Sequence, residues 1–327
     1  MKRSYIQVFL FLVALLSCTT FPACGVDDEI NNLLESDVWT EIDSLIFTST
    51  SHARFYINVR AREGVNVSEL GVVYSTSQNP NLSNNKKLLG NSVGRKLCEL
   101  WDLQANTTYY VRIYAICDED VVYGEEKSFT TKIATYENGY EYIDLGLSVK
   151  WAKYNVGATN EHELGDYFAW GEIVPKENYT WNNYKYCDGS YTSLTKYNNR
   201  SAYGEVDNLF TLELSDDAAR ANWGGSWRMP SIAEWTELHE QCTWEWINRN
   251  GVYGYNITSK SNGNTIFLHG AGNNGNSSLY AENGYYWSSS HYFDYPSNAY
   301  SICFDKKAVE RTHFSRYCGL SVRPVCP

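Results

Sequence analysis

The chain has 327 residues, a formal net charge of −11 and 43% hydrophobic residues. A length beyond roughly 250–300 residues favours more than one hydrophobic core. The acidic balance, with no basic cluster after the first residues, argues against nucleic acid as a partner, because phosphate binding needs clustered cations. Nine cysteines suit an exported protein in which disulfides can form, and none has the CxxC spacing of a zinc or redox site.

The N-terminus carries an export signature. Lys2 and Arg3 precede an apolar run that is too short to span a bilayer, which predicts a secretory signal peptide. The run ends in Leu-Ser-Cys at Cys18, which resembles a bacterial lipobox, and Cys24 precedes an acidic run similar to the surface-export signal of Bacteroidetes lipoproteins. The resemblance implies a lipid anchor on Cys18, with Cys24 as the other candidate processing site, and an outer-membrane or cell-surface location. The alternative is an ordinary cleaved signal with two incidental cysteines.

Composition and patterning divide the rest of the chain into segments. We expect a signal and lipobox region, an acidic polar tether, a first domain, a short linker and an aromatic-rich second domain. Their predicted bounds are 1–24, 25–41, 42–132, 133–138 and 139–327.

The first domain has the alternating pattern of an all-β fold, with turn residues between short runs. The expected strands are Arg54–Arg60, Leu70–Ser75, Lys96–Leu103, Tyr109–Cys117 and Gly124–Thr131. The stretch from Asn106 to Tyr109 resembles the corner before strand F of a fibronectin type III domain, with Tyr109 as its corner tyrosine. The resemblance implies a β-sandwich that serves as a spacer or mount.

The second domain begins with two predicted helices. One covers Asp216–Asn222, with Ser215 as a candidate cap and Gly224 as a stop, and the other covers Ser231–Cys242. Ser231 and Glu234 form a capping-box motif at the start of the second helix. Turns rich in Gly and Asn then separate the expected strands, which are Thr265–His269, Tyr285–Ser289, Ala299–Phe304 and Leu320–Val325. This order predicts an α+β domain.

Six blocks in the second domain resemble the Fibrobacter succinogenes major paralogous domain, which is related to C-type lectins and formylglycine-generating enzymes. They are Gly139–Lys153, Asn155–Ala158, Gly165–Glu172, Asp217–Trp227, Gly284–Ser289 and Gly319–Val325. The resemblance implies a C-type-lectin-like fold for 139–327 and therefore a multidomain chain, a fibronectin III-like sandwich followed by an α+β lectin-like domain. It also makes Trp223–Trp235 a marker of the fold, with its tryptophans in the core and Arg228 paired internally.

Catalytic and metal chemistry finds little support. Formylglycine-generating enzymes use a cysteine pair near the C-terminus, which would be Cys318 and Cys326, but the surrounding residues do not match that active loop. The calcium-binding triplets of sugar-binding C-type lectins do not occur, and the histidines share no metal-ligand spacing. We therefore expect no enzyme activity, no cofactor and no metal, with formylglycine-generating chemistry as the least favoured alternative.

The cysteines suggest two candidate disulfides. Cys98 and Cys117 flank one hairpin-like unit of the first domain, and Cys242 and Cys326 are the favoured pair of the second. Cys187, Cys303 and Cys318 would then be free or optional.

Aromatic residues near the C-terminus form the predicted binding site. Tyr and His side chains mixed with small polar residues supply rigid contact area and adaptable hydrogen bonds. The candidate ligand-binding residues are Tyr292, Phe293, Tyr295, Tyr300, His313, Phe314 and Tyr317. The partner would be a glycan or a surface protein.

Two alternatives to a ligand-binding protein stay open. The chain could be a fimbria-associated or other structural subunit, whose aromatic surface meets another subunit. It could also be a variable target of a diversity-generating retroelement, because the residue types at 291–303 and 313–318 can be reached from an asparagine codon by adenine-directed changes.

Overall fold

The computed structural model describes residues 37–117, 120–249, 251–273 and 282–327. The predicted signal peptide, Cys18 and Cys24 lie outside these residues. The chain separates into two compact units, and the second includes the segments Ile46–Arg54 and Glu99–Thr108 as well as Thr130–Pro327.

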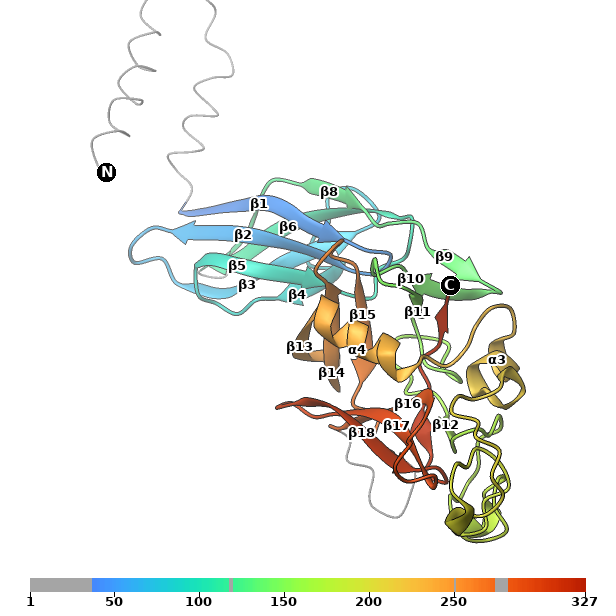
Figure 1. Ribbon diagram of the computed structural model, residues 1–327. Helices are drawn as coiled ribbons and strands as arrows, with labels where there is room; N and C mark the ends of the chain where they lie inside the picture. The colour runs from blue at the N-terminus through green and yellow to red at the C-terminus, as the bar shows by residue number, and fades with distance from the viewer. Residues whose placement is uncertain (1–36, 118–119, 250, 274–281) are drawn as a thin grey trace, which may run out of the picture. The chain divides into compact units, whose positions relative to one another are not determined.

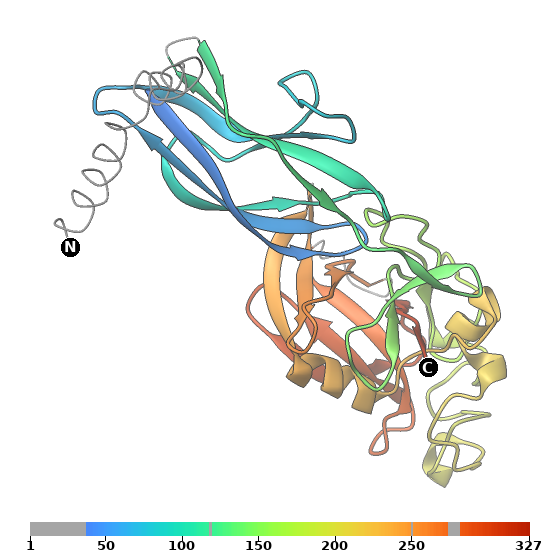
Figure 2. The ribbon, with the colours of Figure 1, turned by 90° about the horizontal axis from the view of Figure 1, so that it is seen from above.

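The first unit is built from antiparallel strands (Figures 1 and 2). One sheet has the order β1-β2-β5 and the other the order β4-β3-β6-β7, with β8 paired to β6. The bounds are β1 Val38–Thr48, β2 Ala53–Ala61, β3 Val67–Ser75, β4 Asn85–Leu88, β5 Gly94–Leu100, β6 Thr108–Cys117, β7 Asp120–Tyr123 and β8 Lys127–Thr130. The described elements of this unit are all strands, as the sequence predicted.

Alternation along the strands explains the core of this unit. Phe55, Ile57 and Val59 of β2 are buried while the residues between them are half-buried, which is the two-residue period of a strand with one face inward. Tyr109 is also buried, and its ring stacks on Phe129 at 5.8 Å between centroids. The hydrogen bond expected from a tyrosine corner stays a prediction.

Three strands of the first unit were not expected from the sequence. The predicted tether to residue 41 is wrong at its end, because β1 begins at Val38 and the Val38 side chain is buried. All four residues of β4 are exposed, so this strand has no apolar alternation that could reveal it. β7 is short and likewise has no buried residue.

The second unit contains three sheets. Their orders are β20-β11-β10-β9, β12-β19-β16-β17-β18 and β13-β14-β15. The bounds are β9 Thr135–Glu137, β10 Tyr140–Ile143, β11 Lys150–Ala152, β12 Tyr167–Phe168, β13 Cys242–Arg249, β14 Val252–Ser259, β15 Thr265–His269, β16 Gly284–His291, β17 Asn298–Phe304, β18 Val309–Ser315, β19 Leu320–Ser321 and β20 Val325–Cys326. β15, β16 and β17 lie where the sequence predicted strands. The predicted strand Leu320–Val325 is instead two short strands, β19 and β20, and β9 to β14 and β18 were missed.

Among its described residues, the second unit also has two α-helices and three single 3-10 turns. The helices are α3 Ala218–Trp223 and α4 Ile232–Gln241, and the turns are η2 Trp181–Asn183, η3 Ser201–Tyr203 and η4 Leu214–Asp216. α4 contacts β13, β16 and β17 and so packs against two of the sheets (Figure 1).

The capping box of α4 is confirmed. Ser231 Oγ accepts a hydrogen bond from Glu234 N at 3.2 Å, and Ser231 N donates to the Glu234 carboxylate at 2.8 Å. Arg228 donates to the same carboxylate at 2.8 Å, which confirms its internal pairing. The helix ends at Gln241, one residue before its predicted end, and β13 starts at Cys242.

The cap of α3 differs from the prediction. Asp217, and not Ser215, is the N-cap, because its carboxylate accepts from the amides of Ala219 and Arg220 at 2.9 and 3.1 Å. A carboxylate at this position satisfies amides that would otherwise be unpaired at the helix start. The predicted stop is confirmed at Gly224, whose φ of 65° is left-handed.

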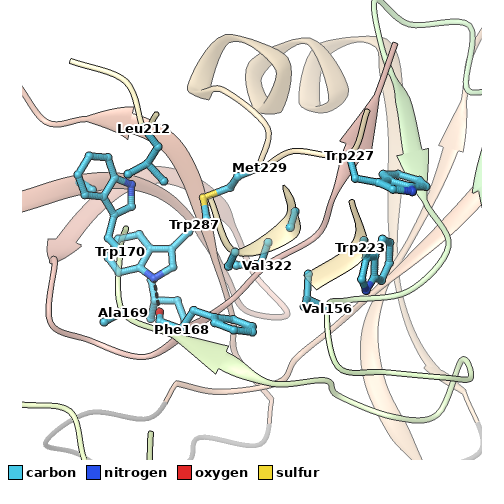
Figure 3. Packing of buried hydrophobic residues seen from close by; sticks show 14 of the residues in the cluster. Val156, Phe168, Ala169, Trp170, Leu212, Trp223, Trp227, Met229, Trp287 and Val322 are labelled. Atoms are coloured by element: carbon cyan, nitrogen blue, oxygen red, sulfur yellow. Dashed lines mark hydrogen bonds between the residues drawn. The ribbon is translucent and has the colours of Figure 1, made fainter. Parts of the chain in front are cut away.

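Tryptophans fill the core of the second unit, as Figure 3 shows for one cluster. Trp170, Trp227 and Trp287 are fully buried, and each indole N–H donates to a backbone carbonyl, at 2.8, 2.7 and 2.7 Å. Because each of these three indole N–H groups has a partner, no unpaired N–H reduces the free energy that burial of the rings contributes to folding. Trp223 and Trp235 are buried as well, as predicted for a fold marker.

The cysteine prediction for the second unit needs correction. Cys242 and Cys326 are both free thiols, and they belong to different hydrophobic clusters, so packing does not bring them together as a pair. Cys98 and Cys117 are buried on β5 and β6, which lie in different sheets, and their bridge stays a prediction.

The capping box predicts a measurable loss of stability. Ser231→Ala removes the side-chain acceptor for Glu234 N and should lower the free energy of unfolding by about 1 kcal/mol, measured by denaturant titration. Ser201→Ala, at an exposed serine, is the control and should change little. Equal effects of the two substitutions would contradict the role of the cap.

Candidate functional site

The loop between β16 and β17, residues 292–297, carries the centre of the predicted site. It is closed by backbone hydrogen bonds between Tyr292 N and Asn298 O at 3.2 Å and between Asn298 N and Tyr295 O at 2.8 Å. The tight closure holds consecutive aromatic side chains close together. Tyr292 lies at the centre of this group.

Tyr292 contacts three of the other predicted residues. Its ring stacks on His313 at 3.9 Å and meets Tyr300 edge-on at 4.9 Å and Tyr295 at 6.0 Å. The register of β17 and β18 opposes Tyr300 and His313, which places both on one face of the sheet. Asn298 Nδ2 lies 2.8 Å from His313 Nδ1 and fixes the imidazole.

Two exposed phenylalanines extend this group. Phe293 stacks on Phe210 at 5.8 Å, with the ring planes 27° apart. Phe293 is 57% exposed, Phe210 42% and Tyr295 51%. We call these three residues the aromatic patch. Phe210 was not identified from the sequence, because a single phenylalanine in a loop gives no signal until the fold brings it beside Phe293.

Phe314 and Tyr317 lie apart from the other predicted residues. Phe314 follows His313 on β18 and therefore points to the opposite face of the sheet, where it meets Tyr285 edge-on at 5.3 Å. Tyr317 packs edge-on against Trp181 at 5.0 Å. The structure thus brings together four of the seven candidate residues, Tyr292, Tyr295, Tyr300 and His313, with Phe293 next to them in the loop. Strand alternation separates Phe314 from them, and Tyr317 lies in the turn after β18.

A buried arginine holds the loop in place. Arg316 is fully buried, and its guanidinium donates to the backbone carbonyls of Pro296, Tyr197 and Lys196 at 3.0, 3.0 and 2.9 Å. Its Nε donates to the Tyr184 hydroxyl at 2.8 Å. The five donors of a guanidinium lie in one plane, so a single side chain can join these separate segments.

The charge of Arg316 is met by neutral groups. No ion pair to it occurs within the part of the chain that the structure describes. Its guanidinium lies 5.2 Å from the ring centroids of both Trp170 and Tyr184, where the negative face of an aromatic ring attracts a cation. Ring faces and carbonyl dipoles therefore replace a counterion.

Tyr197, whose carbonyl oxygen accepts a hydrogen bond from Arg316, has a strained backbone. Its φ is +59°, a left-handed value that costs about 1–3 kcal/mol for a bulky residue. The surroundings hold it there, because its amide donates to Asp207 at 2.6 Å and its hydroxyl donates to Asp216 at 2.7 Å. Burial of Asp216 opposes its ionisation, but hydrogen bonds led by that from Lys196 outweigh burial and lower its pKa to about 2. The segment leading to Phe210 is thus rigidly anchored.

His291 lies beneath the aromatic patch. It is buried, and its ring meets Phe210 edge-on at 6.1 Å and lies the same distance from Trp170. Burial, reinforced by the charge of Arg316, lowers the pKa of His291 to about 4. The imidazole is therefore neutral at physiological pH and supports Phe210 as an uncharged ring.

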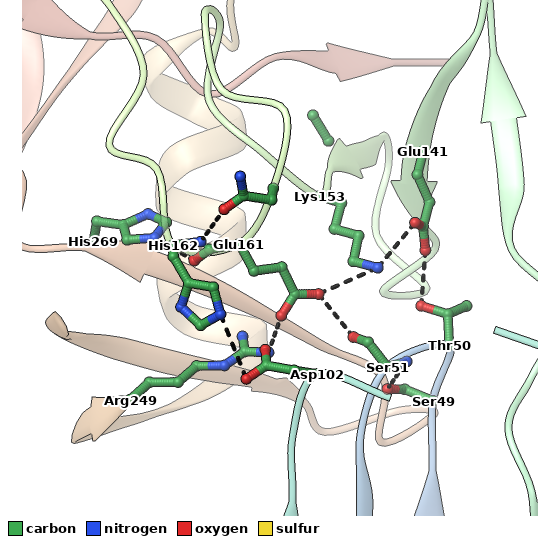
Figure 4. A network of polar contacts seen from close by, with 12 residues as sticks. Ser49, Thr50, Ser51, Asp102, Glu141, Lys153, Glu161, His162, Arg249 and His269 are labelled. Atoms are coloured by element: carbon green, nitrogen blue, oxygen red, sulfur yellow. Dashed lines mark hydrogen bonds and ion pairs between the residues drawn. The ribbon is translucent and has the colours of Figure 1, made fainter. Parts of the chain in front are cut away.

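A second group of polar residues in this unit forms an ionic network (Figure 4). Arg249 pairs with Asp102 at 2.9 Å and with Glu161, while Lys153 lies between Glu141 at 2.9 Å and Glu161 at 3.2 Å. The hydroxyls of Thr50 and Ser51 donate to the Glu141 and Glu161 carboxylates. Each carboxylate in this network therefore has at least one cationic partner.

The two cysteines that the sequence analysis compared with the cysteine pair of formylglycine-generating enzymes are poorly ionised. Burial raises the pKa of Cys318 and of Cys326 to about 11. A thiol must lose its proton to ligate metal or attack a substrate. The described residues contain no group of three or more His, Cys, Asp or Glu side chains placed to hold a metal, and no helix among them is long and apolar enough to cross a membrane.

Comparison with known proteins adds a weak likeness in fold. No protein-family model matches the chain, and no curated protein matches it. Solved structures with partial similarity include fibronectin type III domains. That of human contactin 1 shares 14% identity at a TM-score of 0.23, covering 31% of this chain and 78% of that one. The sixth such domain of human fibronectin type III domain containing protein 3 shares 17% identity at a TM-score of 0.23, covering 30% and 85%.

A bacterial structure shows the same degree of similarity. The sensor domain of the anti-sigma factor RsgI4 in Pseudobacteroides cellulosolvens shares 16% identity at a TM-score of 0.23, covering 30% of this chain and 98% of that one. Scores this low indicate nothing about activity.

The role of Arg316 predicts a large effect of a conservative change. Arg316→Lys keeps the charge but cannot reach four acceptors, so it should lower the free energy of unfolding by about 3 kcal/mol or more, measured by denaturant titration. Arg311→Lys, at an exposed arginine of β18, is the matched control and should stay within about 0.5 kcal/mol. A loss no greater than that of the control would contradict the anchoring role.

The lowered pKa of His291 predicts a pH dependence of stability. As pH falls below the ordinary value of 6.5, the unfolded chain gains a proton at this site that the folded chain does not gain until about pH 4. The contribution of His291 is therefore intact above pH 6.5 and is lost between 6.5 and 4, with a slope of up to about 1.4 kcal/mol per pH unit. Thermal unfolding of His291→Gln from pH 4 to 8 should show a flatter profile than the unaltered protein, and parallel profiles would refute the assignment.

Proposed function

We propose that this chain is a lipid-anchored cell-surface protein that binds a glycan or protein ligand through the aromatic patch. In this proposal residues 139–327 have the C-type-lectin-like fold of the Fibrobacter paralogous family, and the fibronectin-like part is a mount. The protein is non-catalytic and uses no cofactor. The observation that carries the proposal is the exposure of Phe210, Phe293 and Tyr295 on a rigid loop framework.

Exposure of these rings favours binding over a role in the core. Each ring would gain free energy by burial, and neighbouring apolar side chains left in contact with water commonly mark interaction sites. The Arg316 contacts fix the loop backbone, so little conformational entropy has to be lost when a ligand binds. Exposed Asp294 and Arg200, 3.8 Å apart, add polar groups at the rim.

Support for a non-catalytic role comes from the state of the reactive groups. The Cys318 and Cys326 thiols have raised pKa values, and the carboxylates of the ionic network are paired. An exposed platform of rings is suited to contact with a ligand.

Binding is tested on glycan and protein arrays with the purified protein. Phe210→Ala combined with Phe293→Ala, and separately Tyr295→Ala, should each weaken binding to a recognised ligand by about 10-fold or more, because buried aromatic anchors carry much of an interface. Tyr136→Ala, at a tyrosine that is 61% exposed on β9, is the matched control. Binding that is unchanged in both patch variants would exclude this surface as the site.

A further inference from the structure

Three polar side chains share one face of the β13-β14-β15 sheet. Asn256 is opposite Phe267, and Gly254, two residues earlier on β14, is opposite His269, so Asn256 and His269 point to the same side. Arg249 is opposite Val252 on the neighbouring strand pair and falls on this side as well. The three residues are buried, with exposed fractions of 5% for Arg249, 1% for Asn256 and 2% for His269.

Each of these side chains has one buried atom without a hydrogen-bond partner among the described residues. The atoms are Arg249 Nε, Asn256 Oδ1 and His269 Nδ1. Leaving such an atom unpaired costs about 1–3 kcal/mol. Other buried side-chain atoms of the second unit also lack a partner, but among the described residues only on this sheet face do three such side chains lie together around one cavity.

Hydrogen-bond chemistry assigns a role to each atom. Arg249 Nε carries a hydrogen and is a donor, and Asn256 Oδ1 is an acceptor. His269 Nε2 lies 2.8 Å from the Glu161 carbonyl oxygen and must donate to it, which leaves Nδ1 of the neutral ring as an acceptor. The face therefore presents one donor and two acceptors.

These side chains line a single small cavity in the second unit. Its other walls include His52 and Trp101, and the space open to the centre of a water molecule is about 20 Å³. About 10–15 Å³ suffices for one water molecule, so the cavity has room for a molecule of this size. Of the two ring nitrogens of His52, Nδ1 lacks a hydrogen-bond partner and Nε2 lies 3.7 Å from the Glu99 carboxylate.

The chemistry of the cavity wall selects among ligands of this size. A cation would meet the positive guanidinium of Arg249, and an anion would meet the lone pairs of Asn256 Oδ1 and His269 Nδ1. A neutral molecule that accepts one hydrogen bond and donates two fits all three atoms. Water is the smallest such molecule.

We propose that this cavity is a specific binding site for one internal water molecule, which accepts from Arg249 Nε and donates to Asn256 Oδ1 and His269 Nδ1. The water completes the pairing of Arg249, whose Nη2 already binds Asp102 and Glu161 in the ionic network. It also links that network to β14 and β15.

The direct test uses the unaltered full chain. Water-selective NMR on 15N-arginine-labelled protein should show a cross peak of negative NOE sign from a long-lived water to the Arg249 Nε–H, and a crystal structure at high resolution should show density within hydrogen-bonding distance of all three atoms. A dry cavity, or an Nε–H that contacts no long-lived water, would overturn the proposal.

A pair of substitutions at Asn256 separates water binding from packing. Asn256→Leu has a similar volume but no acceptor, so it should abolish the water cross peak and raise the unfolding equilibrium constant about 10-fold or more. Asn256→Asp keeps an acceptor oxygen in the same place, so folded protein with this substitution should retain the cross peak. Persistence of the cross peak in Asn256→Leu would exclude Asn256 as a partner of the water.

Discussion

The aromatic patch depends on one buried cation, the guanidinium of Arg316. Burial of a charge costs several kcal/mol, and here no carboxylate offsets that cost. Four hydrogen bonds to neutral oxygens do so, each worth roughly 1.5–3 kcal/mol when one partner is charged, and two aromatic faces contribute further. Because three of the four acceptors are backbone carbonyls from two separate segments, the arginine determines how the 292–297 loop meets the chain around Tyr197. The strain at Tyr197 is tolerated because Arg316, Asp207 and Asp216 fix that residue together.

Arg323 repeats this arrangement elsewhere in the second unit. It is fully buried and donates to Asn155 Oδ1 at 2.8 Å and to the carbonyls of Ala152, Lys153 and Phe267 at 2.9, 2.5 and 2.8 Å. Burial lowers its pKa to about 10, which leaves it charged at neutral pH. A unit with many loops has many carbonyls that no strand or helix satisfies, and a buried guanidinium meets several of them at once. The β13-β14-β15 face of the same unit differs, because its unpaired atoms are one donor and two acceptors. A molecule that both accepts and donates hydrogen bonds is needed there, which is the role that we propose for the internal water.

Most local signals in the sequence were reliable, although the cap of α3 is Asp217 and not Ser215, and several features that depend on strand pairing were missed. The Ser231–Glu234 capping box and the Gly224 stop involve residues within a few positions of each other, so their patterns alone predict them. β13 was missed although Trp244 and Trp246 alternate with Thr243 and Glu245, because the strand follows α4 directly and no turn residue marks its start. The aromatic site was predicted in part, since composition identifies the 292–295 loop. The strand register assigns Phe314 to the opposite face, and the pairing of Phe210 with Phe293 joins residues more than eighty positions apart.

The Arg316 contacts also have a consequence for how this surface can evolve. The arginine donates hydrogen bonds to the carbonyl oxygens of Pro296, Tyr197 and Lys196 and does not bind the side chains of the loop. Every amino acid has such a backbone carbonyl. Substitutions at Phe293, Asp294 and Tyr295 therefore leave the anchor intact, and these three positions are exposed, so their replacement creates no cavity in the core. The loop can thus change its recognition chemistry while its backbone keeps one shape. Because the residues that hold the backbone differ from those that contact a ligand, selection could change the ligand without destabilising the fold.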